Sequence, residues 1–191
     1  IDFSRFHGLQ RRLVGLIAYR NATDVFLESI PRLRALRALA LAGPAITDDR
    51  AGDIASLPWL RQLQLEATSL TPQGVAAFCD LQHLSSLDLS DHDFGDDPLD
   101  VLACFENLRE LDLSTARAGP WAIHDSVLQN VAHLTGLREL DISGTRVGDS
   151  GLRHLNTLTE LRELSLSGTS VTDQGLRHLS GLTELRLLWL S

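Results

Sequence analysis

Acidic side chains recur in pairs along this sequence. In two copies of L-R-E-L-D, a glutamate and an aspartate stand two residues apart: Glu110 with Asp112, and Glu139 with Asp141. Paired carboxylates can act as general acid and base, or they can attract a basic partner. Because such pairs are repeated through the sequence, they do not single out one catalytic site.

Other groups that carry catalysis are scattered. The seven histidines do not cluster, and His154 and His178 occupy equivalent places in adjacent copies of a repeat, which explains them better than a metal site does. The sequence holds no nucleophile elbow, phosphate-binding loop or C-x-x-C motif. We therefore expect no catalytic residues, no metal, no cofactor and no enzyme activity in this chain.

One segment concentrates aspartates and raises the question of calcium, whose ligands are often carboxylates close in sequence. The cluster comprises Asp88, Asp91, Asp93, Asp96, Asp97 and Asp100. Its spacing does not fit an EF-hand loop, because position 12 counted from Asp91 is Leu102. We interpret the cluster as a solvated loop.

The whole sequence is built from copies of one repeat. The pattern L-x-x-L-x-L recurs every 24 residues, with one spacing of 29 residues, and its first leucines are Leu36, Leu60, Leu84, Leu108, Leu137, Leu161 and Leu185. With each first leucine as offset 0, apolar residues recur at offsets 0, 3, 5, 10, 15, 18 and 21. A period of this length indicates a solenoid, in which neighbouring repeats supply the burial that one repeat lacks.

Each repeat changes its periodicity once. Offsets 3 and 5 alternate as in a strand, whereas offsets 15, 18 and 21 advance by three as in a short helix. Thr172 and the residues Asp48, Asp96, Asp125 and Asp149 stand between the two patterns. Because such side chains accept hydrogen bonds from free backbone N–H groups, we expect them to cap the helices.

The segment from Leu161 to Glu184, LRELSLSGTSVTDQGLRHLSGLTE, resembles a leucine-rich repeat. Its T-D-x-G-L text is similar to the bacterial 24-residue kind, as in the GALA-type and ribonuclease-inhibitor-like groups. The family often has asparagine at offset 8, where this chain has Thr68, Thr145 and Thr169. An unbroken asparagine ladder is therefore not expected, although a threonine hydroxyl can still bond the backbone of the turn.

The resemblance covers nearly the whole chain and implies an α/β fold. We expect a leucine-rich-repeat solenoid, a right-handed horseshoe with parallel strands on its concave face and short helices on its convex face. Residues 1–191 would form a single array of about seven to eight repeats. The family's usual site of recognition is the surface of such an array, and we expect a protein-interaction module.

Side chains at offsets 2, 4 and 6 should point into the concave face, because residues two apart in a strand share a face. There they would form an acidic band that ends in an apolar patch at Leu187 and Trp189, a surface suited to a partner protein with a basic surface. Arginines at offset 1 (Arg109, Arg138 and Arg162) would relieve part of the repulsion. The candidate residues on this face are Gln64, Asp88, Glu110, Asp112, Glu139, Asp141, Glu163, Ser165 and Trp189. The alternative is that L-R-E-L-D-L is simply the usual sequence of this repeat and has no role in binding.

The 29-residue repeat that starts at Leu108 carries a further candidate. Counting back from Leu137 places its five extra residues within residues 117–122, just after the strand. The loop should protrude at the rim of the concave face and present Trp121, a residue type enriched at binding hot spots. Alternatively, Trp121 folds back onto its own loop.

Residues 12–35 read as a degenerate repeat. Arg12, Gly15 and Ile17 stand at offsets 0, 3 and 5, where leucine is usual. The helix side is restored by Leu27, Ile30 and Leu33. Because the sequence opens in mid-repeat and stops one residue past a strand at Ser191, we expect it to be a piece of a longer protein.

Charge narrows the classes of partner. The net charge is −8, and residues 38–191 carry 22 acidic residues against ten arginines. An acidic surface is a poor match for nucleic acid. No apolar run approaches the roughly 18 residues of a membrane helix, so we expect neither a nucleic-acid nor a membrane partner. The oligomeric state is left open.

Cysteine usage and the basic residues bear on location. Cys79 and Cys104 lie at offsets 19 and 20 of adjacent repeats, on the convex side, where we favour free thiols over a bridge. All 17 basic residues are arginine. Base-composition bias of a bacterial genome explains this best, and avoidance of ubiquitin inside a host cell is the alternative. We expect a cytoplasmic protein, or a secreted bacterial effector that acts in a host cytoplasm.

These observations lead to one expected function and two alternatives. The chain would bind a partner protein through its concave face or rim, as the recognition arm of a bacterial effector or of a larger sensor protein. In the first alternative it is the substrate-recognition or autoinhibitory arm of an enzyme, such as a ubiquitin ligase, whose catalytic part lies elsewhere. In the second it is a structural spacer or oligomerisation arm.

Overall fold

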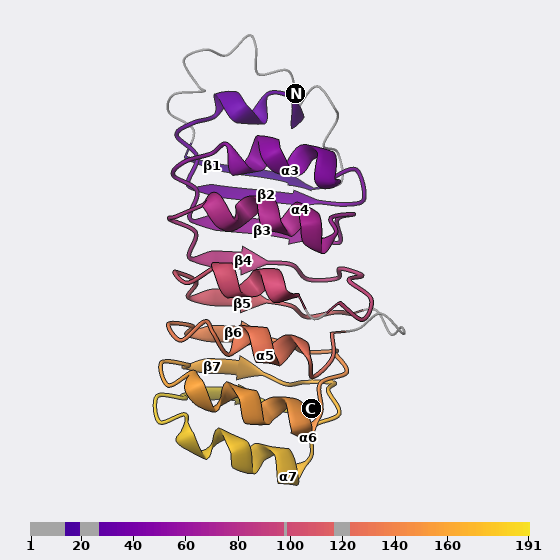
Figure 1. The fold of residues 1–191 in the computed structure, drawn as a ribbon, viewed down its shortest axis with the longest axis vertical. Coiled ribbons are helices and arrows are strands. Elements are labelled where there is room, and N and C mark those ends of the chain that lie inside the picture. Colours follow the sequence, from indigo (N-terminus) through magenta and orange to yellow (C-terminus); the bar gives the residue numbers. More distant parts are fainter. Residues whose placement is uncertain (1–13, 20–26, 98, 117–122) are drawn as a thin grey trace.

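The computed structural model of the protein describes residues 14–19, 27–97, 99–116 and 123–191 and stacks them as successive coils (Figure 1). Each coil adds one strand to an eight-stranded parallel sheet in which strand order follows the sequence. The strands are β1 Gly15–Tyr19, β2 Ala38–Ala42, β3 Gln62–Glu66, β4 Ser86–Asp88, β5 Glu110–Asp112, β6 Glu139–Asp141, β7 Glu163–Ser165 and β8 Leu187–Trp189. This is the predicted leucine-rich-repeat solenoid.

Short helices cover the opposite side of the stack (Figure 1). They are η2 Ile30–Arg32, α3 Asp48–Ala55, α4 Pro72–Ala76, η3 Ala77–Asp80, η4 Asp100–Cys104, α5 Val127–Val131, α6 Asp149–Leu152, η5 Arg153–Thr157, α7 Asp173–Leu176 and η6 Arg177–Gly181. In several coils an α-helical turn runs directly into a 3-10 turn, because only a few residues are available before the chain must return to the sheet.

The leucines of successive strands form the core. Leu39 pairs with Leu63, and Leu63 pairs with Leu87, so that the same offset lies side by side in neighbouring strands. Leu140 and Leu164 continue the column in β6 and β7 and are almost fully buried. Apolar side chains at the helix offsets close the core from the other side. The predicted seven-offset pattern is confirmed in the repeats that begin at Leu36, Leu60, Leu84, Leu108 and Leu137, where all seven offsets are buried.

The first repeat departs from the predicted register by one residue. Gly15 pairs with Ala38, and Leu16 pairs with Leu39, so Leu16 rather than Gly15 stands at offset 3. Ile17, expected in the core, is 68% exposed on the sheet face. A shift of one residue in a strand moves every side chain to the other face. The 23-residue spacing to the next repeat, one shorter than elsewhere, produced the error, whereas the helix-side residues Leu27, Ile30 and Leu33 are buried as predicted.

Threonines at offset 8 bond the turn that follows each strand. The hydroxyl of Thr145 donates to the Ile142 carbonyl at 2.6 Å, and that of Thr169 donates to the Leu166 carbonyl at 2.6 Å. Threonine therefore satisfies a backbone acceptor at this place, as predicted, without an asparagine ladder.

The aspartates at offset 12 do not cap their own helices. Asp48 and Asp149 are the first residues of α3 and α6, and neither helix has a side-chain cap. Asp149 accepts hydrogen bonds from the backbone N–H and the hydroxyl of Thr172 in the next repeat, both at 2.7 Å. Asp48 accepts the same pair from Thr71 at 2.8 and 2.6 Å. We call this contact the carboxylate brace. The N-cap prediction holds only for Thr172, whose hydroxyl accepts from the Gln174 N–H.

The brace explains the glycine of the T-D-x-G-L text. A Cβ on Gly175 would lie 2.3 Å from Asp149 Oδ1, and one on Gly74 would lie 2.1 Å from Asp48 Oδ1. The carboxylate thus occupies the space that a side chain would need. The brace also holds the pKa of Asp149 below its ordinary value, because both hydrogen bonds from Thr172 favour the charged form.

His92 stands at offset 8 of the repeat that begins at Leu84, and it is buried. Its Nδ1 lies 3.0 Å from the Leu89 carbonyl and 3.2 Å from the Ser90 carbonyl, so Nδ1 carries the proton. Nε2 then accepts from the hydroxyl of Thr68 in the preceding repeat, 2.5 Å away. Burial lowers the pKa of His92, which outweighs the opposing hydrogen bonds and the nearby carboxylates of Asp88 and Asp91. The imidazole is therefore neutral near pH 7.

We expect this histidine to make stability depend on pH. A base whose pKa is lowered by folding contributes stability above its unfolded pKa of 6.5, and this contribution is lost as the pH falls from 6.5 toward the folded value. Urea unfolding of wild type and His92→Asn should show it, since asparagine does not titrate. The stability difference between the two proteins should shrink as the pH falls below 6.5. A constant difference would contradict a neutral, buried His92.

The two cysteines form a disulfide between η3 and η4, and the expectation of free thiols at Cys79 and Cys104 is wrong. The repeat that begins at Leu84 has the 3-10 helix η4 at this place, and the two Cα atoms lie 5.6 Å apart.

Candidate functional site

Nine of the ten candidate residues line one groove of about 580 Å³ on the sheet face. They come from six neighbouring strands and are Gln64, Asp88, Glu110, Asp112, Glu139, Asp141, Glu163, Ser165 and Trp189. The strands place them there because offsets 2 and 4 face away from the leucine core. Trp121 lies outside the described residues, as do Arg12 and the segment 117–122.

The glutamates at offset 2 stand directly beside one another. Glu110 pairs in register with Glu139, and Glu139 pairs with Glu163. Neighbouring strands in a sheet are about 4.8 Å apart, so three carboxylates follow one another at roughly this spacing. Partial burial raises the pKa of Glu139, and the charges of Glu110 and Glu163 raise it further. The sheet register thus concentrates negative charge that a basic group would relieve.

The aspartates at offset 4 have a structural task as well. Asp88, Asp112 and Asp141 each accept a hydrogen bond from the backbone N–H two residues later, at 2.8 to 2.9 Å. Such a bond forms an Asx-turn, which ends the strand and starts the loop. Burial raises the pKa of Asp112, while its bonds to Ser114 lower it and the charges of the other two aspartates raise it. These three residues therefore both shape the turn and contribute charge.

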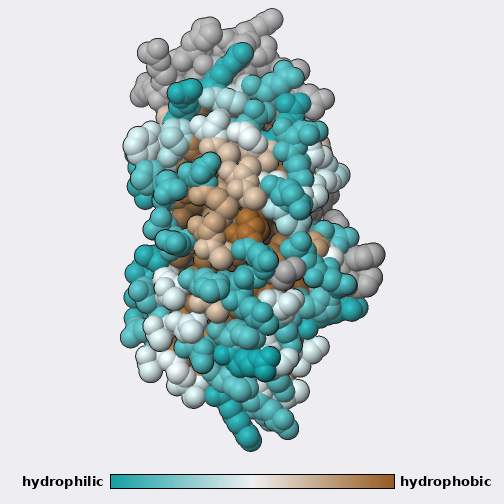
Figure 2. Space-filling view, viewed as in Figure 1, coloured by the Kyte–Doolittle hydropathy of each residue, from teal (hydrophilic) through white to brown (hydrophobic). Residues whose placement is uncertain are grey.

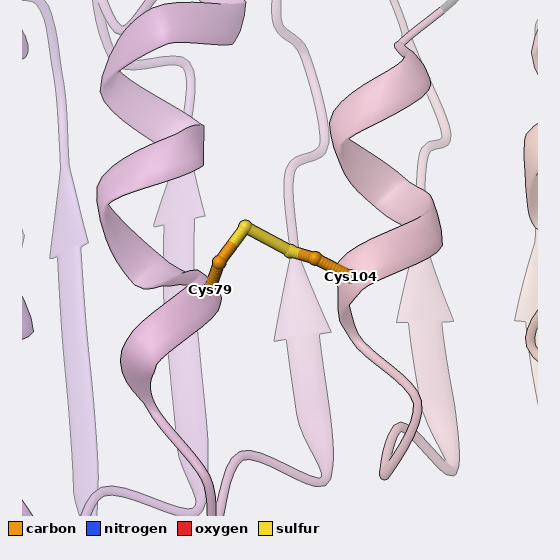
Figure 3. The surroundings of a disulfide bond; sticks show 2 residues. All are labelled: Cys79 and Cys104. Carbon is orange, nitrogen blue, oxygen red and sulfur yellow. A yellow bond between two sulfur atoms is a disulfide. The ribbon is translucent and has the colours of Figure 1, made fainter.

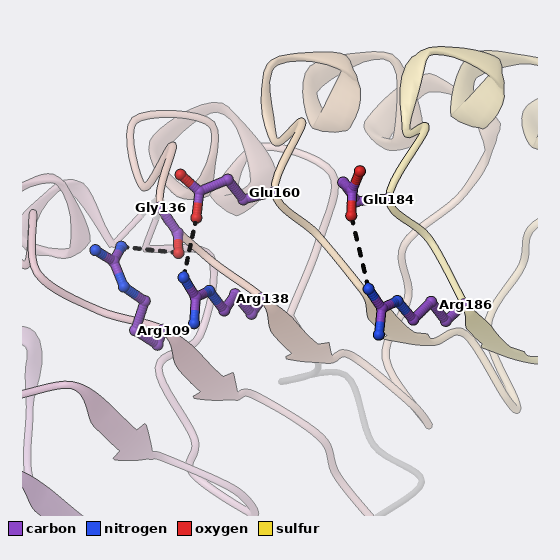
Figure 4. A network of polar contacts seen from close by, with 6 residues as sticks. All are labelled: Arg109, Gly136, Arg138, Glu160, Glu184 and Arg186. Atoms are coloured by element: carbon purple, nitrogen blue, oxygen red, sulfur yellow. Dashed lines mark hydrogen bonds and ion pairs between the residues drawn. The ribbon is translucent and has the colours of Figure 1, made fainter.

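The rim arginines are engaged away from the acidic groove (Figure 4). Arg109 donates to the Gly136 carbonyl at 2.8 Å. Arg138 lies 3.5 Å from Glu160, a residue of the loop that precedes the next strand. Arg109 and Arg138 were expected to relieve the repulsion among the groove carboxylates, and these contacts show that their guanidinium groups point elsewhere. The guanidinium groups of Arg109 and Arg138 therefore do not neutralise the groove carboxylates.

Apolar surface lies at both ends of the acidic groove. At the last strand, Leu187 and Trp189 are 47% and 44% exposed. At the first strands, a second groove is lined by Ile17, Ala38 and Ala40 and shares Gln64 and Glu110 with the acidic one. The sheet face therefore offers charge in its middle and apolar contact at its ends.

The aspartates clustered in the repeat that begins at Leu84 accept hydrogen bonds from their own loop and from the next repeat. Asp93 and Asp97 accept from the N–H groups of Gly95 and Leu99. Asp91 accepts from the hydroxyl of Thr115 and the N–H of Ala116 in the next repeat. Within the described ranges, no three His, Cys, Asp or Glu side chains are arranged to hold a metal ion.

Ser143 and Ser167, at offset 6, also line the groove, as strand alternation predicted. One feature of the surface was missed from the sequence. On the rim, Trp59 is 55% exposed and stacks on His83 with ring centroids 5.1 Å apart. These two residues share offset 23, where the later repeats have Asn107, Gly136, Glu160 and Glu184, so the sequence itself indicated an aromatic pair there.

The helix side is largely hydrophilic, with one apolar area near its middle (Figure 2). The area lies over α4 and the helices beside it, where Ala55, Ala77 and Val101 are partly buried and pack against the core. Apolar groups here are the outer margin of the core. Of the helices described, none is long and apolar enough to cross a membrane.

The geometry of the coils defines the class. Residues 80–103, 133–155 and 154–180 match the family model described as Leucine Rich repeat. Together with the eight-stranded parallel sheet, this match gives the described coils the fold of a leucine-rich-repeat solenoid. The finer 24-residue subgroup is not established by the match.

Two solved structures from Listeria monocytogenes have a similar fold. An internalin (inlF) superposes with a TM-score of 0.61 and 21% sequence identity, covering 83% of this chain and 42% of the internalin. Internalin C2 superposes with a TM-score of 0.60 and 20% identity, covering 97% of this chain and 84% of that protein. This chain thus spans less than half the length of the first of them. No curated protein matches the sequence.

Proposed function

We propose that this chain is a protein-binding module whose sheet-face groove takes a basic segment of a partner protein. The observation that carries the proposal is the row formed by Glu110, Glu139 and Glu163, which stand in register while the neighbouring arginines are engaged at the rim. Solenoids commonly use the extended surface of their sheet for recognition. Charge complementarity would mainly set specificity and the rate of association.

The apolar ends of the groove support a partner that brings more than charge. Exposed Trp189 offers a large, rigid contact surface, and aromatic residues of this kind often contribute most of the binding energy. Arginine is the favoured basic residue, because its planar group can bond two carboxylate oxygens at once and stack on an aromatic ring. We therefore propose an arginine-rich segment flanked by apolar residues.

We also propose two roles for the whole protein. A recognition arm of a bacterial effector or of a larger sensor protein is consistent with a surface of this chemistry and with the T-D-x-G-L subgroup. In the same way, the substrate-binding arm of an enzyme would use the same groove.

Replacing the three groove glutamates by glutamine should weaken binding of an arginine-rich peptide by at least about tenfold, which is about 1.4 kcal/mol. Glu110→Gln, Glu139→Gln and Glu163→Gln remove charge without touching the Asx-turn aspartates. Fluorescence anisotropy with a labelled peptide of arginine and leucine would measure the change. Equal affinity of wild type and variant would contradict the proposal.

A matched control changes the same amount of charge elsewhere. Asp49→Asn, Asp80→Asn and Glu106→Gln alter exposed residues outside the sheet-face grooves and should leave the affinity nearly unchanged. Acid should weaken binding to wild type early, because Glu139 and Asp112 have raised pKa values and lose their charge before ordinary carboxylates do. Added salt should weaken it as well, because the contact is charged and exposed.

A further inference from the structure

Carboxylate braces link most neighbouring repeats on the helix side. Asp48 bonds Thr71, and Asp149 bonds Thr172, each across one boundary. Between these, Asp125 accepts from the N–H of Gly148 at 2.7 Å and also bonds the hydroxyl of Ser150. The brace therefore runs from offset 12 of one repeat to offset 11 of the next.

One boundary has no residue that can form the brace. Pro72 stands at offset 12 of the repeat that begins at Leu60, and its ring offers no side-chain acceptor. At the following boundary a carboxylate is present again at this place, but Asp96 contacts the His124 side chain, 3.7 Å from Nε2, and does not form the brace. Among the described repeats from Leu36 to Leu161, the boundary after Pro72 is thus the one that lacks a carboxylate at this place.

The disulfide crosses that same boundary (Figure 3). Cys79 belongs to η3 of the repeat that contains Pro72, and Cys104 belongs to η4 of the next repeat. The Cys104 side is exposed and Cys79 is half-buried, so a small thiol can reach the bond.

The repeat that contains Cys104 also departs from its regular neighbours on the helix side. Its helix side has only the five-residue 3-10 helix η4 within the described residues. The loop before it contains Asp91 and Leu99 with φ of 56° and 51°, values that non-glycine residues rarely adopt. A segment with such local strain and a short helix gains more from a covalent link than a regular repeat does.

We propose that the Cys79–Cys104 disulfide takes the place of the missing carboxylate brace and makes this repeat boundary redox-sensitive. When a dithiol reduces it, one thiolate of the reductant attacks the sulfur of one cysteine and expels the thiolate of the other. The second thiol of the reductant then attacks the reductant's own sulfur in this mixed disulfide and releases the first cysteine. Two electrons and two protons pass to the protein, which gains two thiols, while the reductant becomes a cyclic disulfide. The helices can then separate while the pairing of β3 with β4 holds the sheet together.

Whether the Cys79–Cys104 disulfide forms depends on the compartment in which the protein works. Disulfides persist mainly in oxidising compartments. In a reducing cytoplasm, the setting expected from the sequence, both cysteines would be thiols and this boundary would be open. We therefore propose that the closed form belongs to an oxidising environment.

Hydrogen exchange measured by mass spectrometry tests whether the disulfide holds η3 and η4 together. We expect dithiothreitol to speed exchange by on the order of tenfold in peptides from η3 and η4, because local opening exposes their amides. Peptides from β3 and β4, and from α6 to η6, should be unchanged. The double variant Cys79→Ser with Cys104→Ser should give the same pattern without reductant.

The brace supplies a matched control. Asp149→Ala removes a carboxylate brace at the boundary between α6 and α7, so faster exchange should appear there and should not depend on dithiothreitol. Three outcomes would overturn the proposal: unchanged exchange at η3 and η4 after reduction, equal acceleration along the whole array, or two reactive thiols in protein folded under oxidising conditions.

Discussion

Leu164→Asp should unfold the array or cost at least about 4 kcal/mol of its free energy of unfolding. Leu164 is fully buried in β7, between Leu140 and Leu188 of the neighbouring strands. The substitution removes a large apolar side chain and places a carboxylate where it has no water and no basic partner. Guanidinium unfolding monitored by circular dichroism would measure the loss.

The adjacent residue gives the control for this substitution. Ser165 points into the groove on the opposite face, so Ser165→Arg should change the stability by less than about 1 kcal/mol. A melting curve for Leu164→Asp that coincides with wild type would mean that the faces of β7 are assigned wrongly. Reversed results for the two variants would mean the same.

Gly144→Ala should destabilise the protein by at least about 2 kcal/mol. Gly144 has φ of +71°, and a Cβ there would lie 1.8 Å from the backbone carbonyl oxygen of Thr115 in the preceding repeat. A backbone oxygen cannot move away by changing rotamer, so the two coils must shift apart. Thermal and chemical unfolding should both report the loss.

Two other glycines separate the contributions to this effect. Gly168 has φ of +68° and its Cβ would meet only ordinary contacts, so Gly168→Ala should cost about 1 kcal/mol for the backbone conformation alone. Gly52 lies in α3 with open space around it, so Gly52→Ala should stabilise by about 0.5–1 kcal/mol. Equal effects of Gly144→Ala and Gly168→Ala would show that the carbonyl contact is unimportant.

Most of the fold was predictable because one text is repeated. When the same offsets carry leucine in copy after copy, the pairing partners and the buried face follow from the period, as Leu140 and Leu164 illustrate. The prediction failed where the period changed: the first repeat is one residue shorter, and Ile17 was placed on the wrong face. A strand of five residues contains too little alternation to correct a slip of one residue.

The chemistry of side chains between repeats was harder to predict. The aspartate of T-D-x-G-L looked like an ordinary N-cap, since its partner Thr172 is 23 residues from Asp149 and only the stacking brings them together. The disulfide was misjudged for the same reason, because the path of η4 decides whether the cysteines meet. The groove residues were predicted together because their position depends only on strand alternation, and their role in binding stays a prediction.

The carboxylate brace also makes the stack of repeats directional, because it always runs from one repeat to the next one in the sequence. A repeat that forms the brace on both sides has an acceptor toward the repeat that follows it and a donor toward the repeat that precedes it, in the same two sequence places. A whole 24-residue unit such as residues 137–160 is therefore a cassette with matching ends. Such a unit can be duplicated in the gene to lengthen the sheet face, whereas the boundary after the repeat that contains Pro72 has a covalent bond in place of the brace.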